Sequence, residues 1–143
     1  MLWRLRLWLA TRPIRVETAA AREQLANGTE DWLAWWRASG ERELRCILMT
    51  AWDPIGVADA PEAWDEYDDY IPGVAGRLRD AKGFDEKLAS VHEYLNHLER
   101  DFIAEELTEK RSQHNAFIAE CLLAWHEWSY DREGRPPHEW LGR

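Results

Sequence analysis

The residues most capable of chemistry are four neighbouring carboxylates: Asp65, Glu66, Asp68 and Asp69. Aromatic side chains are interleaved with them: Trp64, Tyr67 and Tyr70. On a helix, Asp65, Asp68 and Asp69 would share one face and the two tyrosines would lie to the other side. We predict that these seven residues form a partner-binding surface, in which the carboxylates pair with Lys or Arg of a basic protein.

Two other uses of these carboxylates stay open. Carboxylate oxygens are the ligands that Mg²⁺ and Ca²⁺ prefer, although the spacing does not match the EF-hand loop. The carboxylates could also form a solvated face with local partners such as Arg77 or Arg79. Residue types and spacing alone do not separate these uses from protein binding.

The cluster lies in a segment, Cys46 to Gly76, that holds seven carboxylates and no Lys or Arg. The first of the seven, Asp53, precedes Pro54, where an Asp side chain can cap a turn. If this turn packs against residues 65–70, carboxylates there can accept hydrogen bonds from backbone N–H groups or tyrosine hydroxyls. Asp53 is therefore predicted to be structural, and the binding prediction is restricted to the four later carboxylates.

Sequence motifs for enzymatic chemistry are missing. The chain has no P-loop, GxGxxG or GxSxG motif, and no HExxH or ExxH pair. Glu93 and His97 are four residues apart and could face one ligand, whereas His114 falls on an apolar stripe and is predicted to be a satisfied core histidine. We predict a protein that is not an enzyme, with no catalytic residue, no metal site and no cofactor.

The charge of the chain is strongly negative and unevenly distributed. The formal net charge is −9, from 27 acids and 18 bases, and residues 1–16 contain four arginines and no acid. An acidic body repels nucleic acid and attracts basic protein surfaces, so the predicted partner is a basic protein, toxin- or nuclease-like, and not nucleic acid directly. The alternative is that the acidic balance only maintains solubility.

Two cysteines and the absence of a long apolar run bear on the compartment. Cys46 and Cys121 lie inside apolar runs and are predicted to be buried free thiols in a reducing compartment; a disulfide or a catalytic thiol is the less favoured alternative. No apolar run approaches the roughly 20 residues that span a bilayer, and the N-terminus lacks a signal-peptide pattern. We therefore predict a cytoplasmic protein without a membrane span.

The N-terminal third is predicted to contain an ambiguous segment followed by helices. Residues 1–12 read as a short strand or arm, or as a basic amphipathic helix, with three competing uses: packing on the core, a homodimer contact, or a membrane-surface anchor. Residues 14–27 are rich in helix formers and end at Asn27-Gly28. Thr29 is the predicted N-cap of a helix whose tryptophans pack in the core: Trp32, Trp35 and Trp36.

Further elements are predicted from apolar spacing and from Gly and Pro. Ser39-Gly40 should break the chain before a helix over 41–52, which Asp53-Pro54 should end. A helix should start at Ala60-Pro61, run through Tyr70, kink or break at Pro72-Gly73, and resume to Ala81. Residues 84–100 form the clearest helix, and residues 103–130 a long one with a break near Thr108. The tail, 131–143, is predicted to be irregular, with Trp140 packing back onto the body.

These elements predict an all-α fold: a compact single-domain helical bundle of five to seven helices covering residues 1–143. A resemblance supports the region 42–102. The run Trp52 to Val57 (WDPIGV) and the run Asp65 to Tyr70 (DEYDDY) resemble a motif pair, WDPIGV and DEYDxY, in a family of small bacterial helical proteins whose activity is uncharacterised. The resemblance implies a compact helical core, to which this chain adds a Trp/Arg-rich extension over 1–40 and the C-terminal helix. Such proteins look like immunity proteins by analogy only.

The leading functional prediction is an acidic protein-binding module that neutralises a partner protein, as an immunity protein or antitoxin does. A close variant is a DNA mimic that inhibits a nucleic-acid enzyme. The runner-up is a small helical-bundle enzyme or ligand binder that uses the carboxylates with Glu93 and His97, with or without a metal. A third hypothesis is a self-associating module with residues 1–12 as the dimer contact.

Overall fold

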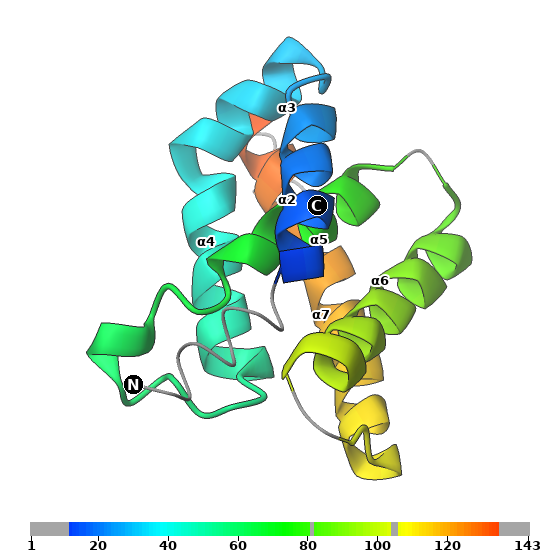
Figure 1. Cartoon of the computed structure of the whole chain (residues 1–143). Helices are drawn as coiled ribbons and strands as arrows, with labels where there is room; N and C mark the ends of the chain where they lie inside the picture. The colour runs from blue at the N-terminus through cyan, green and yellow to red at the C-terminus, as the bar shows by residue number, and fades with distance from the viewer. Residues whose placement is uncertain (1–11, 81, 104–105, 135–143) are drawn as a thin grey trace.

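The computed structural model describes residues 12–80, 82–103 and 106–134 (Figure 1). The predicted all-α class is confirmed, because most of these residues lie in helices and none of them forms a strand. The α-helices are α2 (Arg12–Leu25), α3 (Glu30–Trp35), α4 (Glu41–Ile47), α5 (Ile71–Arg79), α6 (Phe84–Leu98) and α7 (Glu109–Gly134). The predictions for residues 1–11 and for Trp140 lie outside the described residues.

One unbroken helix runs from Glu30 to Trp52, from the top of Figure 1 down its left side in light blue to teal. It consists of α3, a π-helical turn (Trp36–Gly40), α4 and a second π-helical turn (Leu48–Trp52). The prediction that Ser39-Gly40 breaks the chain is wrong. A Cβ on Gly40 would lie 2.9 Å from ring atoms of both Trp35 and Trp36, so this glycine allows the indoles to lie against the backbone and does not end the helix.

Both predicted ends of this helix are confirmed. The Thr29 side chain accepts a hydrogen bond from the backbone N–H of Trp32 at 3.3 Å, as an N-cap residue does. At the other end, Asp53 adopts a left-handed conformation, with φ 30° and ψ 62°, and its N–H donates to the carbonyl of Leu48. Asp tolerates this conformation better than most residues, and Pro54 cannot continue the helix.

The helix predicted from Ala60 to Tyr70 does not form. The chain instead makes a 3₁₀ turn (Pro61–Ala63), further turns, and a second 3₁₀ turn (Asp68–Tyr70). Neighbouring carboxylates repel one another on an α-helix, and a 3₁₀ turn has three residues per turn, which places Tyr67 and Tyr70 on one side. Both rings then reach Trp52, with ring centroids 5.3 and 6.1 Å away.

Pro72 and Gly73 lie in the first turn of α5 instead of kinking a longer helix. Proline costs little there, because the N–H it lacks would have no partner within the helix. Gly73 lies directly beneath Tyr94, and a Cβ at this position would overlap the tyrosine ring and hydroxyl. This Pro-Gly pair therefore starts a helix and lets α6 approach it.

The two C-terminal helices agree with the prediction over most of their length. α6 continues into a π-helical turn (Glu99–Ile103), and the predicted break precedes α7, where the Thr108 hydroxyl accepts a hydrogen bond from the N–H of Arg111 at 3.1 Å. α7 continues to Gly134, so the irregular tail predicted from residue 131 is wrong for residues 131–134.

The core collects buried side chains from the long helix and from α5, α6 and α7, with Leu25 at the end of α2 added to them. α2 packs across α5, and α6 packs along α7 (Figure 1). The fully buried side chains of the core include Leu44, Leu48, Trp52, Ile71, Val74, Leu78, Val91, Leu95, Leu98, Ile118 and Leu122. The core packing predicted for the N-terminal tryptophans is confirmed, since Trp32, Trp35 and Trp36 are all buried.

The cysteines are free, as predicted, but the predicted burial is wrong. Cys46 and Cys121 are both exposed, because each points away from the stripe formed by its neighbours, such as Leu44 and Leu48 beside Cys46. Across the described helices, none combines the length and apolar character needed to cross a bilayer.

Candidate functional site

Four of the seven predicted binding residues, Trp64 to Tyr67, lie on a loop that Asp53 holds in place, and the other three form the 3₁₀ turn that follows it. Its Oδ1 atom accepts hydrogen bonds from the N–H of Val57 at 2.7 Å and from the hydroxyl of Tyr67 at 2.8 Å. Its Oδ2 atom accepts one from the N–H of Ala58 at 3.3 Å. The structural role predicted for Asp53 is confirmed. We call residues 53–67 the Trp64 loop.

Tyr67 and Tyr70, both predicted to contact a partner, are core residues instead. Their exposed fractions are 1% and 5%. Burial raises the pKa of Tyr70 to about 12, helped by the charges of Asp69 and Glu66. Burial also raises the pKa of Tyr67, and its hydrogen bond to Asp53 adds to this, whereas the hydrogen bond from the N–H of Ile55 opposes it. Both rings therefore stay neutral and brace the loop against Trp52.

The four carboxylates divide into two pairs. Asp68 accepts a 2.7 Å hydrogen bond from Nε of Arg45, which raises the pKa of that arginine. Asp69 lies 3.7 Å from the guanidinium of Arg22. Asp65 and Glu66, by contrast, are exposed on the Trp64 loop. Two of the four carboxylates therefore have local arginine partners, as one of the open alternatives proposed.

Arg77 and Arg79 do not supply those partners. The guanidinium of Arg77 lies 3.6 Å from the centroid of the Tyr94 ring, and its Nη1 donates to the carbonyl of Gly73. Arg79 donates from Nη1 and Nη2 to the carbonyls of Leu25 and Gln24, at 2.7 Å each. These two carbonyl groups, at the C-terminal end of α2, also accept the backbone N–H groups of Asn27 and Gly28, so Arg79 adds a second hydrogen bond to each.

Trp64 is the exposed aromatic residue of the loop. Its exposed fraction is 45%, and its indole N–H donates to the carbonyl of Ala58 at 3.1 Å, which fixes the ring over the turn. Ile55, on the same loop, is 50% exposed. The loop also carries four exposed carboxylates: Asp59, Glu62, Asp65 and Glu66. The loop thus presents apolar side chains among negative charges, and sequence reasoning missed Ile55, Asp59 and Glu62 as members of this surface.

A buried polar network beneath Trp52 was also missed. Glu99, 2% exposed, accepts hydrogen bonds from Nε of Arg111 at 2.6 Å and from the amide of Asn115 at 2.8 Å. Asn115 in turn accepts the indole N–H of Trp52 at 3.0 Å, and Arg111 donates to the carbonyl of Trp52. The sequence signal was an acid at an apolar position, one helical turn after Leu95. The network connects the base of the Trp64 loop to α6 and α7.

The residues considered for metal or catalytic chemistry are not brought together. His97 pairs with Asp101 at 2.7 Å, and Glu93 is exposed. The hydrogen bond from His97 lowers the pKa of Asp101. Within the described part of the chain, no group of three His, Cys, Asp or Glu side chains could hold a metal ion. His114 bonds the carbonyl of Ala51 at 3.0 Å, so it is satisfied as predicted, although it is half-buried and lies outside the core.

The fold and the loop define the class: an all-α protein with an acidic loop. Hydrogen bonds to Asp53 and the contact of Tyr67 with Trp52 hold this loop on the core, and its carboxylates and Trp64 are exposed to solvent. Comparison with protein-family models, curated proteins and solved structures gave no match. The resemblance of the WDPIGV and DEYDDY segments to a bacterial family therefore stays a prediction. Their spatial relationship is nevertheless explained, because Asp53 of one segment and Tyr67 of the other share a hydrogen bond.

Proposed function

We propose that this chain is a protein-binding module that neutralises a basic partner protein through the Trp64 loop, in the manner of an immunity protein or antitoxin. The observation that carries the proposal is the exposed indole of Trp64 on a loop with four exposed carboxylates. A half-exposed tryptophan is a typical anchor at interfaces, and the carboxylates favour encounter with a positively charged surface.

The rigidity of the loop supports the same proposal. Asp53 and Tyr67 fix its two ends, and the hydrogen bond from Trp64 to Ala58 fixes the anchor itself. A surface that is already ordered loses less conformational entropy when it binds. A basic partner would then meet the indole in a bound-like orientation.

The proposed surface differs from the seven residues predicted from sequence. Trp64, Asp65 and Glu66 remain contact residues, whereas Tyr67, Tyr70, Asp68 and Asp69 act by holding the loop and its flanks in place. Ile55, Asp59 and Glu62 join the contact set, because all three are exposed on the same loop.

Site-specific photo-crosslinking tests this proposal. A benzophenone amino acid placed at position 64 should capture a basic protein in cells that express the chain. The matched control is the same amino acid at Phe117 of α7, whose exposed fraction is 60%. The proposal fails if both positions capture the same proteins, or if the protein captured at position 64 binds an Asp65→Asn/Glu66→Gln variant as tightly as the wild-type chain.

Neutralisation needs a separate measurement once that partner is identified. Expression of the partner alone should impair growth, and co-expression of the wild-type chain should restore it. The Trp64→Ala variant should restore growth less well, with unchanged helical content by circular dichroism. Equal rescue by both chains would contradict a role for the loop.

A further inference from the structure

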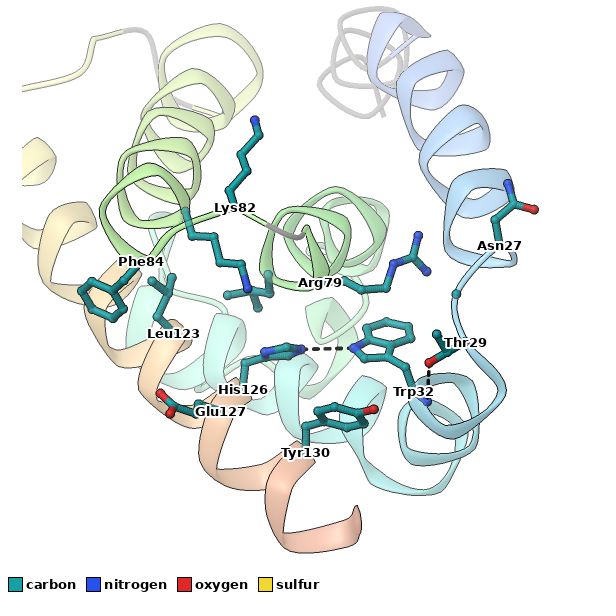
Figure 2. A pocket seen from close by; sticks show the side chains of 13 residues that line it. Asn27, Thr29, Trp32, Arg79, Lys82, Phe84, Leu123, His126, Glu127 and Tyr130 are labelled. Carbon is teal, nitrogen blue, oxygen red and sulfur yellow. Dashed lines mark hydrogen bonds between the residues drawn. The ribbon is translucent and has the colours of Figure 1, made fainter.

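A second surface hollow lies away from the Trp64 loop. It has a volume of about 590 Å³ and is formed by the turn before α3, the connection from α5 to α6, and the C-terminal half of α7. In Figure 2, Phe84 and Leu123 lie on one side of it, Arg79 and Trp32 on the other, and His126 and Tyr130 below. This volume is in the range of small-molecule sites, which is about 300–1,000 Å³.

The base of the hollow is held by ring contacts and by one hydrogen bond. Trp32 is stacked on Trp36, with ring centroids 5.2 Å apart, and the guanidinium carbon of Arg79 lies 5.1 Å from the centroid of the Trp32 ring. The indole N–H of Trp32 donates to Nε2 of His126 at 3.1 Å (Figure 2). An indole N–H can only donate, so His126 accepts through Nε2 and is neutral in this arrangement.

Because Trp32 is buried, with an exposed fraction of 3%, the apolar contact surface of the hollow comes from other side chains. Phe84 lines the hollow and is 60% exposed, Tyr130 is half-buried, and Leu123 is 6% exposed. These residues offer an aromatic and aliphatic wall for a flat apolar group. A ring placed there would cover Phe84, which is otherwise one of the most exposed large apolar side chains of the described chain.

The charge of the hollow is opposite to that of the whole protein. Arg79, Lys82 and Lys87 line it, against the single acid Glu127, although the chain has 27 acids and 18 bases. Lys87 is half-buried and has no ion pair within the described residues. Lys82 lies 3.7 Å from Asp80, with about half of each side chain exposed, and such pairs are weak.

Arg79 is the fixed cation of the three. Its hydrogen bonds to the carbonyls of Leu25 and Gln24 hold the guanidinium in one place. A guanidinium has five N–H donors, so donors remain for a ligand after these two bonds. A fixed arginine and a half-buried lysine that line the same hollow suit an anionic oxygen, because charge-assisted hydrogen bonds are stronger than neutral ones.

We propose that this hollow binds a small aromatic anion. Its ring lies against Phe84, Leu123 and Tyr130, and its carboxylate or phosphate lies between Lys87 and Arg79. This site involves other elements than the Trp64 loop, so the proposal does not depend on the proposed function.

Titration of the ¹⁵N-labelled protein tests the proposal, with the indole N–H signal of Trp32 as the reporter. Phenyl phosphate and phenylacetate are the two probes, one for each anionic group. At least one should shift this signal in a saturable way, with a Kd of about 1 mM or below. Inorganic phosphate and phenol, which each lack half of the ligand, should bind at least about tenfold more weakly.

Two variants and one control localise the binding. Lys87→Gln should weaken binding of the tighter probe about tenfold. Phe84→Ala, at a position that is 60% exposed, should also weaken it, with unchanged helical content by circular dichroism. The control variant is Lys110→Gln. Lys110 is an exposed lysine in the first turn of α7, about 24 Å along the helix from His126. This variant should bind the probe with the same affinity as the wild-type chain. The proposal is overturned if neither probe saturates, if phenol binds as tightly as phenyl phosphate, or if the variants and the control bind equally.

Discussion

The Tyr67 hydroxyl donates a 2.8 Å hydrogen bond to the Asp53 carboxylate, across 14 residues of chain. The same hydroxyl oxygen accepts the N–H of Ile55 at 3.2 Å, so one buried side chain satisfies two groups of the turn. Asp53 itself ends the long helix, and Tyr67 precedes the 3₁₀ turn that leads into α5. This pair therefore sets the position of the Trp64 loop relative to the core.

Tyr67→Phe should lower the free energy of unfolding by about 2 kcal/mol, because it removes a hydrogen bond to a charged group and leaves the N–H of Ile55 unpaired. Urea unfolding followed by circular dichroism measures the change. The matched control is Tyr70→Phe, since the hydroxyl of Tyr70 has no hydrogen bond within the described residues and its ring is equally buried. Equal losses in the two variants would contradict the role given to the Asp53–Tyr67 pair.

Alkaline pH should destabilise the protein through the same two tyrosines. Their ordinary pKa is 10.0, and burial raises the pKa of Tyr70 to about 12 in the folded protein. As the pH rises, the unfolded chain then loses the Tyr70 proton before the folded protein does. The contribution of the neutral Tyr70 side chain to stability is therefore complete below pH 10 and is lost between about pH 10 and 12. The loss is about 1.4 kcal/mol per pH unit for each buried tyrosine in that window.

Urea unfolding at pH 9, 10, 11 and 11.5 measures this dependence. The Tyr70→Phe variant should lose stability less steeply than the wild-type chain, because one of the two titrating groups is removed. Parallel curves for the two proteins would show that Tyr70 does not contribute.

The buried Glu99 should make Arg111 indispensable to stability. Arg111→Met leaves the carboxylate with the amide of Asn115 but without its cation, and an uncompensated buried charge costs roughly 3 kcal/mol or more. Arg100→Met is the control, since Arg100 is exposed and lies 3.4 Å from Asp101; its change should stay within about 0.5 kcal/mol. Thermal and urea unfolding measure the free energy of unfolding of both variants. Similar values for the two would contradict the stabilising role given to the Glu99–Arg111 ion pair.

The helices that could be predicted from sequence are those whose apolar residues recur at helical spacing and whose ends are set by residues nearby in the chain. Residues 84–100 and 103–130 carry apolar side chains at helical spacing, and Thr29 and Asp53 have the local chemistry of a helix start and a helix stop. The sequence also indicated which carboxylate, Asp53, would be structural. These features depend on residues a few positions apart in the chain, so they can be read from a single sequence.

The errors occurred where a distant residue decides the local structure. Gly40 and Gly73 read as breaks, but each is a contact point for a ring, from Trp35 and Trp36 or from Tyr94. The segment 60–70 read as a helix, but its tyrosines turn toward Trp52. The candidate site changed for the same reason, because burial removed Tyr67 and Tyr70 from the surface and placed Ile55 on it.

The two glycines Gly40 and Gly76 should respond to alanine in opposite directions. Within a helix, Gly→Ala normally stabilises by about 0.5–1 kcal/mol. Gly76→Ala in α5 should give this gain, since a Cβ there has no atom within 4 Å. At Gly40 a Cβ would lie 2.9 Å from atoms of two buried indoles, and such overpacking costs about 1–3 kcal/mol. Gly40→Ala should therefore destabilise the protein in urea unfolding. If both variants gained stability, the close approach of Trp35 and Trp36 to the helix backbone would be refuted, and with it the reason that the helix from Glu30 to Trp52 contains a glycine at its centre.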